Sequence, residues 1–276
     1  MGEVESWLQK DWILSDPGSR LSASALTVGY GGAAILRALD FTVPDGAMTV
    51  LVGPNGCGKS TLLKTLARIL APSAGEVRLD GQPIRAIPTR DVARRLALLP
   101  QGPVAPEGLT VGELVAQGRY PHQSFLRQWS AADTRAVDHA LDLTALQSLA
   151  DRPVQSLSGG QRQRAWIAMV LAQETDLILL DEPTTFLDLK VQVDVMSCLA
   201  GIARAGKTLV VVLHELNIAA AFADHLVMMR EGRIVAEGPP AAIMTPGTLH
   251  EVFDLDAQVI ADPLTGRPVC IPRLAA

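Results

Sequence analysis

A glycine-rich loop lies between an apolar run and a helical pattern in the segment 51–67, which reads LVGPNGCGKSTLLKTLA. Residues 53–60 fit GxxxxGK[ST] in full, with the strand before and the helix after that this motif requires. The glycines let backbone N–H groups turn toward phosphate, and the helix N-terminus adds partial positive charge. We therefore expect Lys59 to reach the β- and γ-phosphates of a nucleotide and the Ser60 hydroxyl to ligate Mg²⁺. The residues expected to contact the nucleotide are Gly53, Pro54, Asn55, Gly56, Cys57, Gly58, Lys59, Ser60 and Thr61.

Two carboxylates end a second apolar run, LILLDE, at Asp181 and Glu182. A buried strand that ends in two acids suits a metal site, with Asp181 holding Mg²⁺ and Glu182 polarising the attacking water. Acids also commonly cap a strand before a turn, which Pro183 favours. Because a complete phosphate loop precedes them, we interpret this pair as catalytic.

The bulk composition describes a globular protein without a strongly basic surface. The chain has 276 residues, 48% hydrophobic residues and a formal net charge of -5, which argues against a general nucleic-acid-binding surface. The cysteines Cys57, Cys198 and Cys270 are far apart and form no CxxC pair, so they indicate neither a disulfide framework nor a zinc site. The N-terminus is a poor secretory signal, and the apolar runs are short for a membrane span.

Short predicted strands alternate with turns and helical patterns in the first hundred residues. We predict strands over 26–28, 39–43, 48–52, 76–79 and 95–99 and a helix over 59–71. Helical patterns then dominate 103–157, and continuous apolar runs return at 177–180 and 208–213, as in parallel sheets covered on both faces. This order predicts an α/β fold with a helical insert.

The sequence LSGGQ at 157–161 precedes an apolar helical stretch, so Ser158 is expected to cap a helix. It could be an ordinary cap and turn, but here the chain resembles the ATP-binding cassette (ABC) family, whose signature is LSGGQ. The resemblance covers about residues 26–238. It implies a P-loop NTPase (RecA-like) core with an antiparallel β subdomain and an α-helical subdomain inserted at about 103–160. The expected domain limits are 1–20 for an N-terminal extension, 21–260 for the ATPase domain and 261–276 for a C-terminal tail.

Other family positions are carried over from motifs that appear in the same order. Tyr30 matches the aromatic residue that stacks on adenine, although it could merely pack beside its glycines. Gln101 matches the glutamine that senses Mg²⁺ and water, and Asp188 matches the loop that touches the opposite subunit. His214 matches the histidine that contacts the γ-phosphate. The resemblance implies catalytic roles for Glu182, His214, Lys59 and Gln101, and Mg²⁺ ligation by Ser60, Gln101 and Asp181.

The family architecture also implies a head-to-tail homodimer. In it the signature of one chain closes over ATP held by the phosphate loop of the other. The residues expected to act across the dimer are Ser158, Gly159, Gly160, Gln161 and Asp188.

The resemblance narrows to the ATPases of ferric-siderophore, haem and cobalamin uptake, with the siderophore group most similar. The segments that carry it include GRYPHQ at 118–123, TFLDL at 185–189 and DPLTGRP at 262–268. It implies a peripheral subunit at the cytoplasmic face of the cell membrane, working with a polytopic permease and an extracytoplasmic substrate-binding protein. Haem or cobalamin import is the alternative cargo, and a soluble ABC ATPase acting on nucleic acid is the alternative class, although no nucleic-acid partner is expected.

Two further parts of the sequence have two interpretations each, and a third departs from the family pattern. The segment 120–122 is either a permease contact or a helix-ending turn with a packed aromatic residue. Cys57 is either an exposed, reactive thiol or a small residue tolerated in the loop. Glu215 stands where the subfamily more often has Asp, and no catalytic role is assigned to it.

Overall fold

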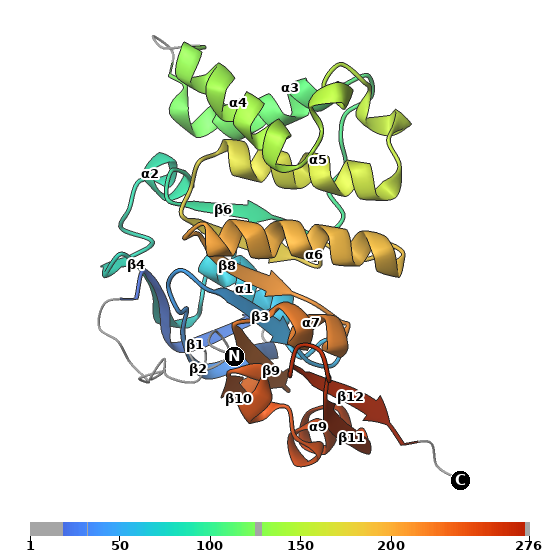
Figure 1. The fold of residues 1–276 in the computed structure, drawn as a ribbon. Helices are drawn as coiled ribbons and strands as arrows, with labels where there is room; N and C mark the ends of the chain where they lie inside the picture. Colours follow the sequence, from blue (N-terminus) through green and yellow to red (C-terminus); the bar gives the residue numbers. More distant parts are fainter. Residues whose placement is uncertain (1–18, 32, 125–128, 274–276) are drawn as a thin grey trace.

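A six-stranded sheet forms the centre of the molecule in the computed structural model, which describes residues 19–31, 33–124 and 129–273 (Figure 1). Its strand order is β10-β9-β3-β8-β7-β6, and every neighbouring pair is parallel except β9 with β10. The strands are β3 (Met48–Val52), β6 (Leu96–Leu99), β7 (Leu177–Asp181), β8 (Thr208–Val212), β9 (His225–Arg230) and β10 (Arg233–Gly238). All residues of β3, β7 and β8 are buried, as the continuous apolar runs predict.

A smaller antiparallel sheet has the order β2-β1-β4-β5. Its strands are β1 (Leu21–Tyr30), β2 (Ala33–Thr42), β4 (Ala74–Leu79) and β5 (Gln82–Pro83). β1 and β2 are longer than predicted because their alternation is interrupted by register shifts, with left-handed backbone at Ala25 and Ala38. Periodicity alone therefore detected only part of each strand.

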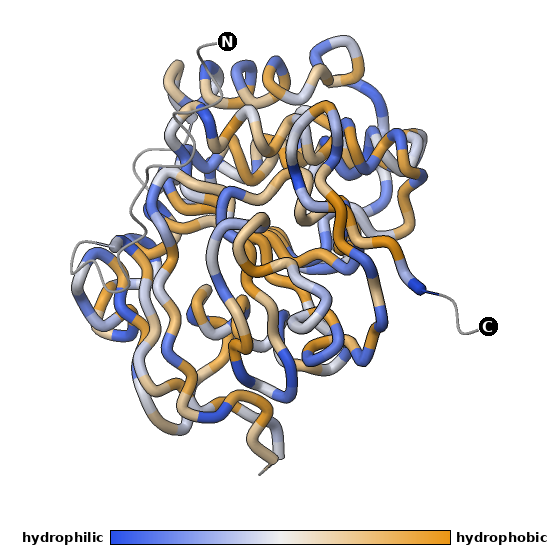
Figure 2. Tube along the Cα trace, turned by 60° about the horizontal axis from the view of Figure 1, so that its bottom comes forward, coloured by the Kyte–Doolittle hydropathy of each residue, from blue (hydrophilic) through white to orange (hydrophobic). Residues whose placement is uncertain are grey.

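The central sheet is covered on both faces. Val50 and Val52 contribute to one apolar cluster, whereas Leu51 between them contributes to the other, as side chains alternate along a strand. One cluster includes the antiparallel sheet and α1 (Lys59–Leu66), and the other includes α5 (Gly159–Ala172), α6 (Leu189–Arg204) and α7 (Leu216–Phe222). The hydropathy colouring in Figure 2 follows this arrangement, with long hydrophobic stretches in the interior strands.

Helices occupy the segment between β6 and β7, at the top of Figure 1. The elements are α3 (Val111–Ala116), η2 (Gln117–His122), α4 (Ala131–Leu143), η3 (Gln147–Leu149), η4 (Val154–Ser156) and α5. Capping boxes start α3 at Thr110 and α4 at Ser130. The remaining elements are α2 (Thr89–Ala93), α8 (Pro240–Ile243), α9 (Pro246–Phe253), β11 (Ala257–Ala261) and β12 (Pro268–Pro272). Among the described helices, none is long and apolar enough to cross a bilayer.

Two segments differ from the sequence-based description. The helix predicted over 59–71 ends at Leu66, because the backbone turns left-handed at Arg68. The segment 261–276, expected as a tail, supplies β12, which pairs along its whole length with β11 and lies against α7. The N-terminal extension expected at 1–20 lies almost wholly outside the described residues.

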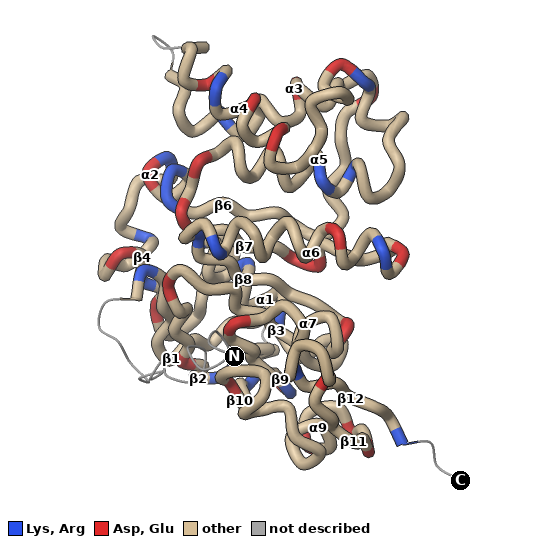
Figure 3. Tube along the Cα trace, viewed as in Figure 1, with Lys and Arg blue, Asp and Glu red and all other residues tan. Residues whose placement is uncertain are grey.

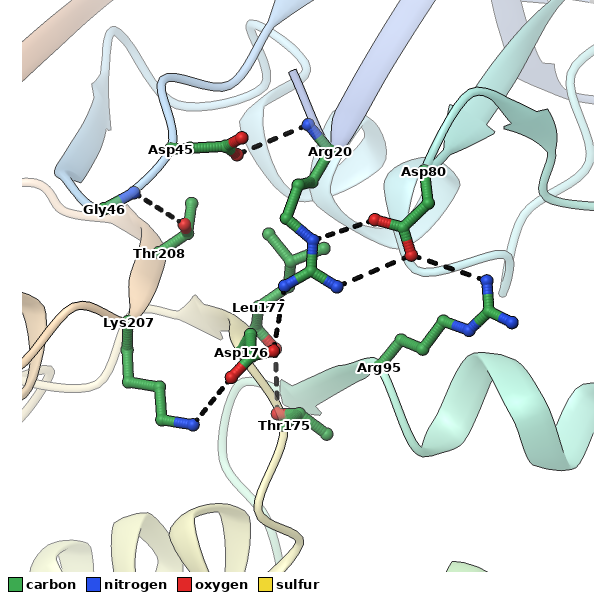
Figure 4. A network of polar contacts seen from close by, with 10 residues as sticks. All are labelled: Arg20, Asp45, Gly46, Asp80, Arg95, Thr175, Asp176, Leu177, Lys207 and Thr208. Atoms are coloured by element: carbon green, nitrogen blue, oxygen red, sulfur yellow. Dashed lines mark hydrogen bonds and ion pairs between the residues drawn. The ribbon is translucent and has the colours of Figure 1, made fainter. Parts of the chain in front are cut away.

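An ion-pair network joins the two sheets where the described chain begins (Figure 4). Arg20 bonds Asp80 at 2.8 Å and Asp176 at 3.0 Å, so one guanidinium links the β4–β5 turn to the start of β7. Lys207 also donates to Asp176, and these two cations hold the pKa of that carboxyl below its usual range. Elsewhere Figure 3 shows acidic and basic residues interspersed along the chain, apart from the group of arginines in and after α2.

Candidate nucleotide-binding and hydrolysis site

The phosphate loop runs from the buried end of β3 into α1. Gly53 has φ 155°, and a Cβ there would lie 2.2 Å from the Met229 carbonyl oxygen, so only glycine fits. Gly58 precedes α1 at φ 107° and supplies no side-chain cap. The first N–H groups of α1 therefore remain free to bind an anion.

Lys59 lies inside this loop with only 5% of its surface exposed. Its ammonium donates to the carbonyl oxygens of Gly53 at 2.7 Å and Pro54 at 3.0 Å. These bonds hold the positive charge within the turn of the loop, where the sequence predicts phosphate. Asn55 and Gly56 are exposed at the tip of the loop.

Ser60 and Asp181 face each other across the start of α1 and the end of β7. The Ser60 hydroxyl donates to Asp181 Oδ1 at 2.8 Å, whereas Asp181 Oδ2 is buried and has no hydrogen-bond partner in the described chain. Burial raises the pKa of the Asp181 carboxyl, and the Ser60 hydrogen bond acts against that rise. An orphaned carboxylate oxygen beside a hydroxyl is a donor set that Mg²⁺ accepts, so these residues fit the ion that the sequence predicts.

The described residues contain no group of three or more His, Cys, Asp or Glu side chains that could hold a metal.

Glu182 contacts two of the other predicted catalytic residues, Gln101 and His214. Its Oε2 accepts from Gln101 Nε2 at 2.6 Å and from the Thr185 hydroxyl at 3.0 Å. Its Oε1 lies 2.5 Å from His214 Nε2. The Glu182 backbone is left-handed at φ 53°, which is uncommon for a residue with a side chain and directs the carboxylate away from the strand.

The signature segment lies at the start of α5 in the helical part of the chain. Ser158 caps α5, as predicted: its Oγ accepts from the Gln161 N–H, and the Gln161 side chain bonds the Ser158 N–H. A Cβ on Gly160 would lie 2.3 Å from Val191 Cγ1, so the signature packs against α6. Within the described residues, the Ser158 hydroxyl therefore bonds inside its own capping box.

Asp188 caps α6, the helix against which the signature packs. Its Oδ1 accepts from the Val191 N–H at 3.0 Å. Two residues before it, Phe186 is left-handed at φ 64° and fully exposed. The predicted trans residues 158–161 and 188 are thus brought together with each other, while Glu182, Gln101, His214, Ser60 and Asp181 form the other group.

Tyr30 belongs to the antiparallel sheet, and Cys57 belongs to the phosphate loop. Tyr30 ends β1, pairs with Ala33 and is 52% exposed, so its ring is accessible. Cys57 is only 5% exposed and belongs to the apolar cluster. The interpretation of Cys57 as an exposed thiol is therefore wrong, since the sequence pattern did not reveal that its side chain turns into the core.

The structure assigns contacts to the residues around 118–123 that sequence reasoning left open. Arg119 is buried, donates to Asp133 at 2.9 Å and Glu174 at 2.7 Å, and joins η2 to α4 and the end of α5. His122 Nε2 lies 2.9 Å from the Gln173 carbonyl oxygen, while Tyr120 is 81% exposed. This segment therefore packs through the buried side chain of Arg119 and leaves Tyr120 exposed.

Two contacts near the site were missed. Thr185 was identified only as part of the segment that contains Asp188, although a hydroxyl three residues after a carboxylate in a turn is a recognisable pattern. Gln192 donates to both the Leu187 carbonyl and Glu215 Oε1, which gives Glu215 a contact one residue from His214. The second contact joins residues distant in sequence, so no local pattern predicts it.

Known proteins are similar to this chain in sequence. The ABC transporter family profile matches residues 36–185. The "Probable siderophore transport system ATP-binding protein YusV" of Bacillus subtilis (strain 168) is 54% identical over 256 residues, covering 92% of this chain and 93% of YusV. The ferric enterobactin transport ATP-binding protein FepC of Escherichia coli (strain K12) is 49% identical over 255 residues, covering 92% and 94%.

A solved structure shares the fold as well. It is the inward-facing conformation of a transporter assigned to the metal-chelate ABC type, with a TM-score of 0.80 and 30% identity over 93% of this chain and 98% of that one. The α/β fold class predicted from the sequence is confirmed.

Proposed function

Because the chain belongs to the ABC transporter family, whose cassettes bind and hydrolyse ATP, we propose that it powers the import of a ferric siderophore through a separate membrane permease. The observation that carries the proposal is the 54% identity to a siderophore transport ATP-binding protein, which extends over 92% of this chain and 93% of that protein. The similarity thus extends well beyond the nucleotide-binding motifs that cassettes in general share.

Each residue around the phosphate loop and Glu182 has a separate role in this proposal. Lys59 and the open N–H groups of α1 bind the phosphates, and Tyr30 stacks on adenine. Ser60 and Asp181, with Gln101, hold Mg²⁺, which neutralises charge on the phosphates when bound. Glu182 orients the attacking water and accepts its proton, and His214 contacts the γ-phosphate.

The signature residues act on a second copy of the chain. Ser158, Gly159, Gly160 and Gln161 lie at the start of a helix that packs against α6, and Asp188 caps that same helix α6. In a head-to-tail homodimer, this group closes over ATP held by the partner's phosphate loop. The dimer works at the cytoplasmic face of the membrane beneath the permease, which receives its cargo from an extracytoplasmic substrate-binding protein.

Gene replacement in the host tests the proposal. Loss of the gene should abolish growth on a ferric siderophore as sole iron source while leaving growth on ferrous iron intact. Wild-type protein should restore growth and Glu182→Gln should not. Loss of growth on haemin but not on siderophores would contradict the assigned cargo, and salt-sensitive binding to DNA without any uptake defect would contradict the transport role.

A further inference from the structure

A threonine hydroxyl contacts the carboxylate that is proposed to activate water. Thr185 lies in the turn between β7 and α6, and its Oγ1 donates to Glu182 Oε2 at 3.0 Å. Its backbone N–H also donates to the Glu182 carbonyl oxygen at 3.4 Å. We propose that Thr185 is a positioning residue for hydrolysis, holding the Glu182 carboxylate in its reactive orientation; this rests on the proposed role of Glu182 as general base.

The three contacts to the carboxylate differ in origin. Gln101 reaches Glu182 from the irregular segment that follows β6, and His214 reaches it from the end of β8. Thr185 is three residues from Glu182 in the same turn, so its contact does not depend on where the other segments lie. It therefore fixes the carboxylate locally, even when Gln101 and His214 turn to other groups.

The backbone of the turn 182–186 has an uncommon conformation that hydrogen bonds must hold in place. Glu182 at φ 53° and Phe186 at φ 64° are both left-handed residues with side chains, a strained backbone that persists only where the surroundings hold it. The Glu182 N–H donates to the Val212 carbonyl oxygen at 3.2 Å, which ties the turn to β8. The Thr185 hydroxyl adds the bond that ties the side chain of Glu182 to the same turn.

This arrangement leaves the two carboxylate oxygens unequal. Among the described residues, Oε2 accepts two hydrogen bonds, from Gln101 and Thr185, whereas Oε1 lies beside His214 alone. Of these two donors, Thr185 is the one that stays beside Glu182 when Gln101 turns to other groups, so its hydrogen bond restricts rotation of the carboxylate plane. Oε1 is then the oxygen that accepts the proton of the attacking water, and Thr185 determines its direction without touching the water.

Steady-state ATPase kinetics of three variants test the assignment. Thr185→Val keeps the side-chain shape but removes the hydroxyl, and we expect kcat to fall about 10- to 100-fold, the effect of losing a hydrogen bond to a charged group, with ATP affinity unchanged. Thr185→Ser keeps the hydroxyl and should restore most of kcat. Thr144→Val is the control, because its hydroxyl bonds the Ala140 carbonyl inside α4 and its loss should not change kcat.

A double-mutant cycle separates positioning from a general structural role. In the Glu182→Gln background, Thr185→Val should lower the residual rate by less than threefold, because the group it positions is no longer a base. An equal loss in both backgrounds, wild-type kcat in Thr185→Val, or failure of Thr185→Ser to restore kcat would each overturn the proposal. If thermal unfolding shows that Thr185→Val is not folded, Thr185→Ala replaces it in the same cycle.

The same data distinguish failure of this inference from failure of the proposed mechanism. Wild-type turnover in Glu182→Gln alone would overturn the base assignment and, with it, this proposal. A strong loss in Glu182→Gln combined with normal turnover in Thr185→Val would leave the base assignment intact and overturn only the role of Thr185.

Discussion

The two groups of site residues satisfy their own polar atoms very differently. Around the signature, Ser158 and Gln161 form a complete capping box, and Asp188 caps the neighbouring helix. Around Glu182 and Asp181 the chain keeps a left-handed glutamate and a buried carboxylate oxygen that has no hydrogen-bond partner among the described residues. In the signature region (158–161 and 188), side chains thus cap the helix ends. In the core region (Ser60, Gln101, Asp181, Glu182 and His214), the left-handed backbone and the buried carboxylate oxygen cost free energy.

This difference indicates where the chemistry resides. Strain and unsatisfied charge persist at positions that a ligand completes, whereas a capped helix start needs no ligand for its own stability. We therefore expect substitutions in the core region to affect hydrolysis and ATP binding within one chain. Substitutions in the signature region should act on the partner chain.

The largest expected effect comes from Glu182→Gln. The amide keeps the shape of the side chain but cannot accept the proton of water, so turnover should fall about 10²- to 10⁴-fold with ATP binding retained. Radiolabelled ATP hydrolysis and equilibrium ATP binding measure the two quantities. Because ATP is bound but not cleaved, an ATP-dependent dimer should accumulate on size-exclusion chromatography, and undiminished turnover would move the catalytic role elsewhere.

A smaller effect is expected for Lys59→Ala. The variant loses the buried ammonium that the loop carbonyls hold in place, and a charge-assisted contact to phosphate of this kind is worth about 10- to 100-fold in affinity. Fluorescent nucleotide titration measures the change. Wild-type affinity in this variant would refute the interpretation of residues 53–61 as the phosphate site.

Much of the local structure of both regions could be predicted from the sequence, because it follows recognisable motifs. The segment 53–60 and the pair Asp181 and Glu182, at the ends of apolar strands, are examples in the core region, and the helix cap at Ser158 is one in the signature region. Contacts between distant segments could not be predicted in this way. The bond from Gln192 to Glu215, the pairing of β12 with β11 and the burial of Cys57 depend on tertiary packing that no periodicity encodes.

Mixing two inactive chains tests whether the signature region acts on a partner. Ser158→Arg should place bulk and a misplaced cation over the partner's phosphate site while leaving ATP binding by its own loop unchanged. Mixed with Lys59→Ala in equal amounts, half of the dimers are heterodimers in which one composite site carries both lesions and the other carries neither. Activity should then recover to about a quarter of wild type if the sites turn over independently.

Cysteine crosslinking provides the control for that mixture. Ser158→Cys and Asn55→Cys, combined with Cys57→Ala, should give ATP-dependent crosslinks between chains, since Asn55 is exposed at the loop tip. Crosslinks formed exclusively within one chain would contradict the head-to-tail arrangement. Crosslinked heterodimers without activity would instead show that both sites must be intact.

The smallest expected effects concern stability, and they should have opposite signs in the two regions. Asp181→Asn should stabilise the fold by about 1 kcal/mol at pH 7, because the amide keeps an acceptor for Ser60 but carries no buried charge. Ser158→Ala should destabilise it by about 1 kcal/mol through loss of the helix cap. Urea denaturation at fixed pH measures both changes.

The pH dependence of the Asp181→Asn effect shows whether burial of the charge is its cause. Burial raises the pKa of Asp181 in the folded protein, so the folded state binds this proton more tightly than the unfolded state does. Wild-type stability therefore loses a contribution as pH rises from the ordinary aspartate pKa through the folded value, and an asparagine avoids that loss. The advantage of Asp181→Asn should be full at pH 7 and should shrink as pH falls through the folded pKa and then below the ordinary value, where the wild-type carboxyl is protonated in both states. Ser158→Ala involves no titrating group and should cost the same at each pH, so an Asp181→Asn effect that is destabilising, or equally independent of pH, would remove the contrast between the two regions.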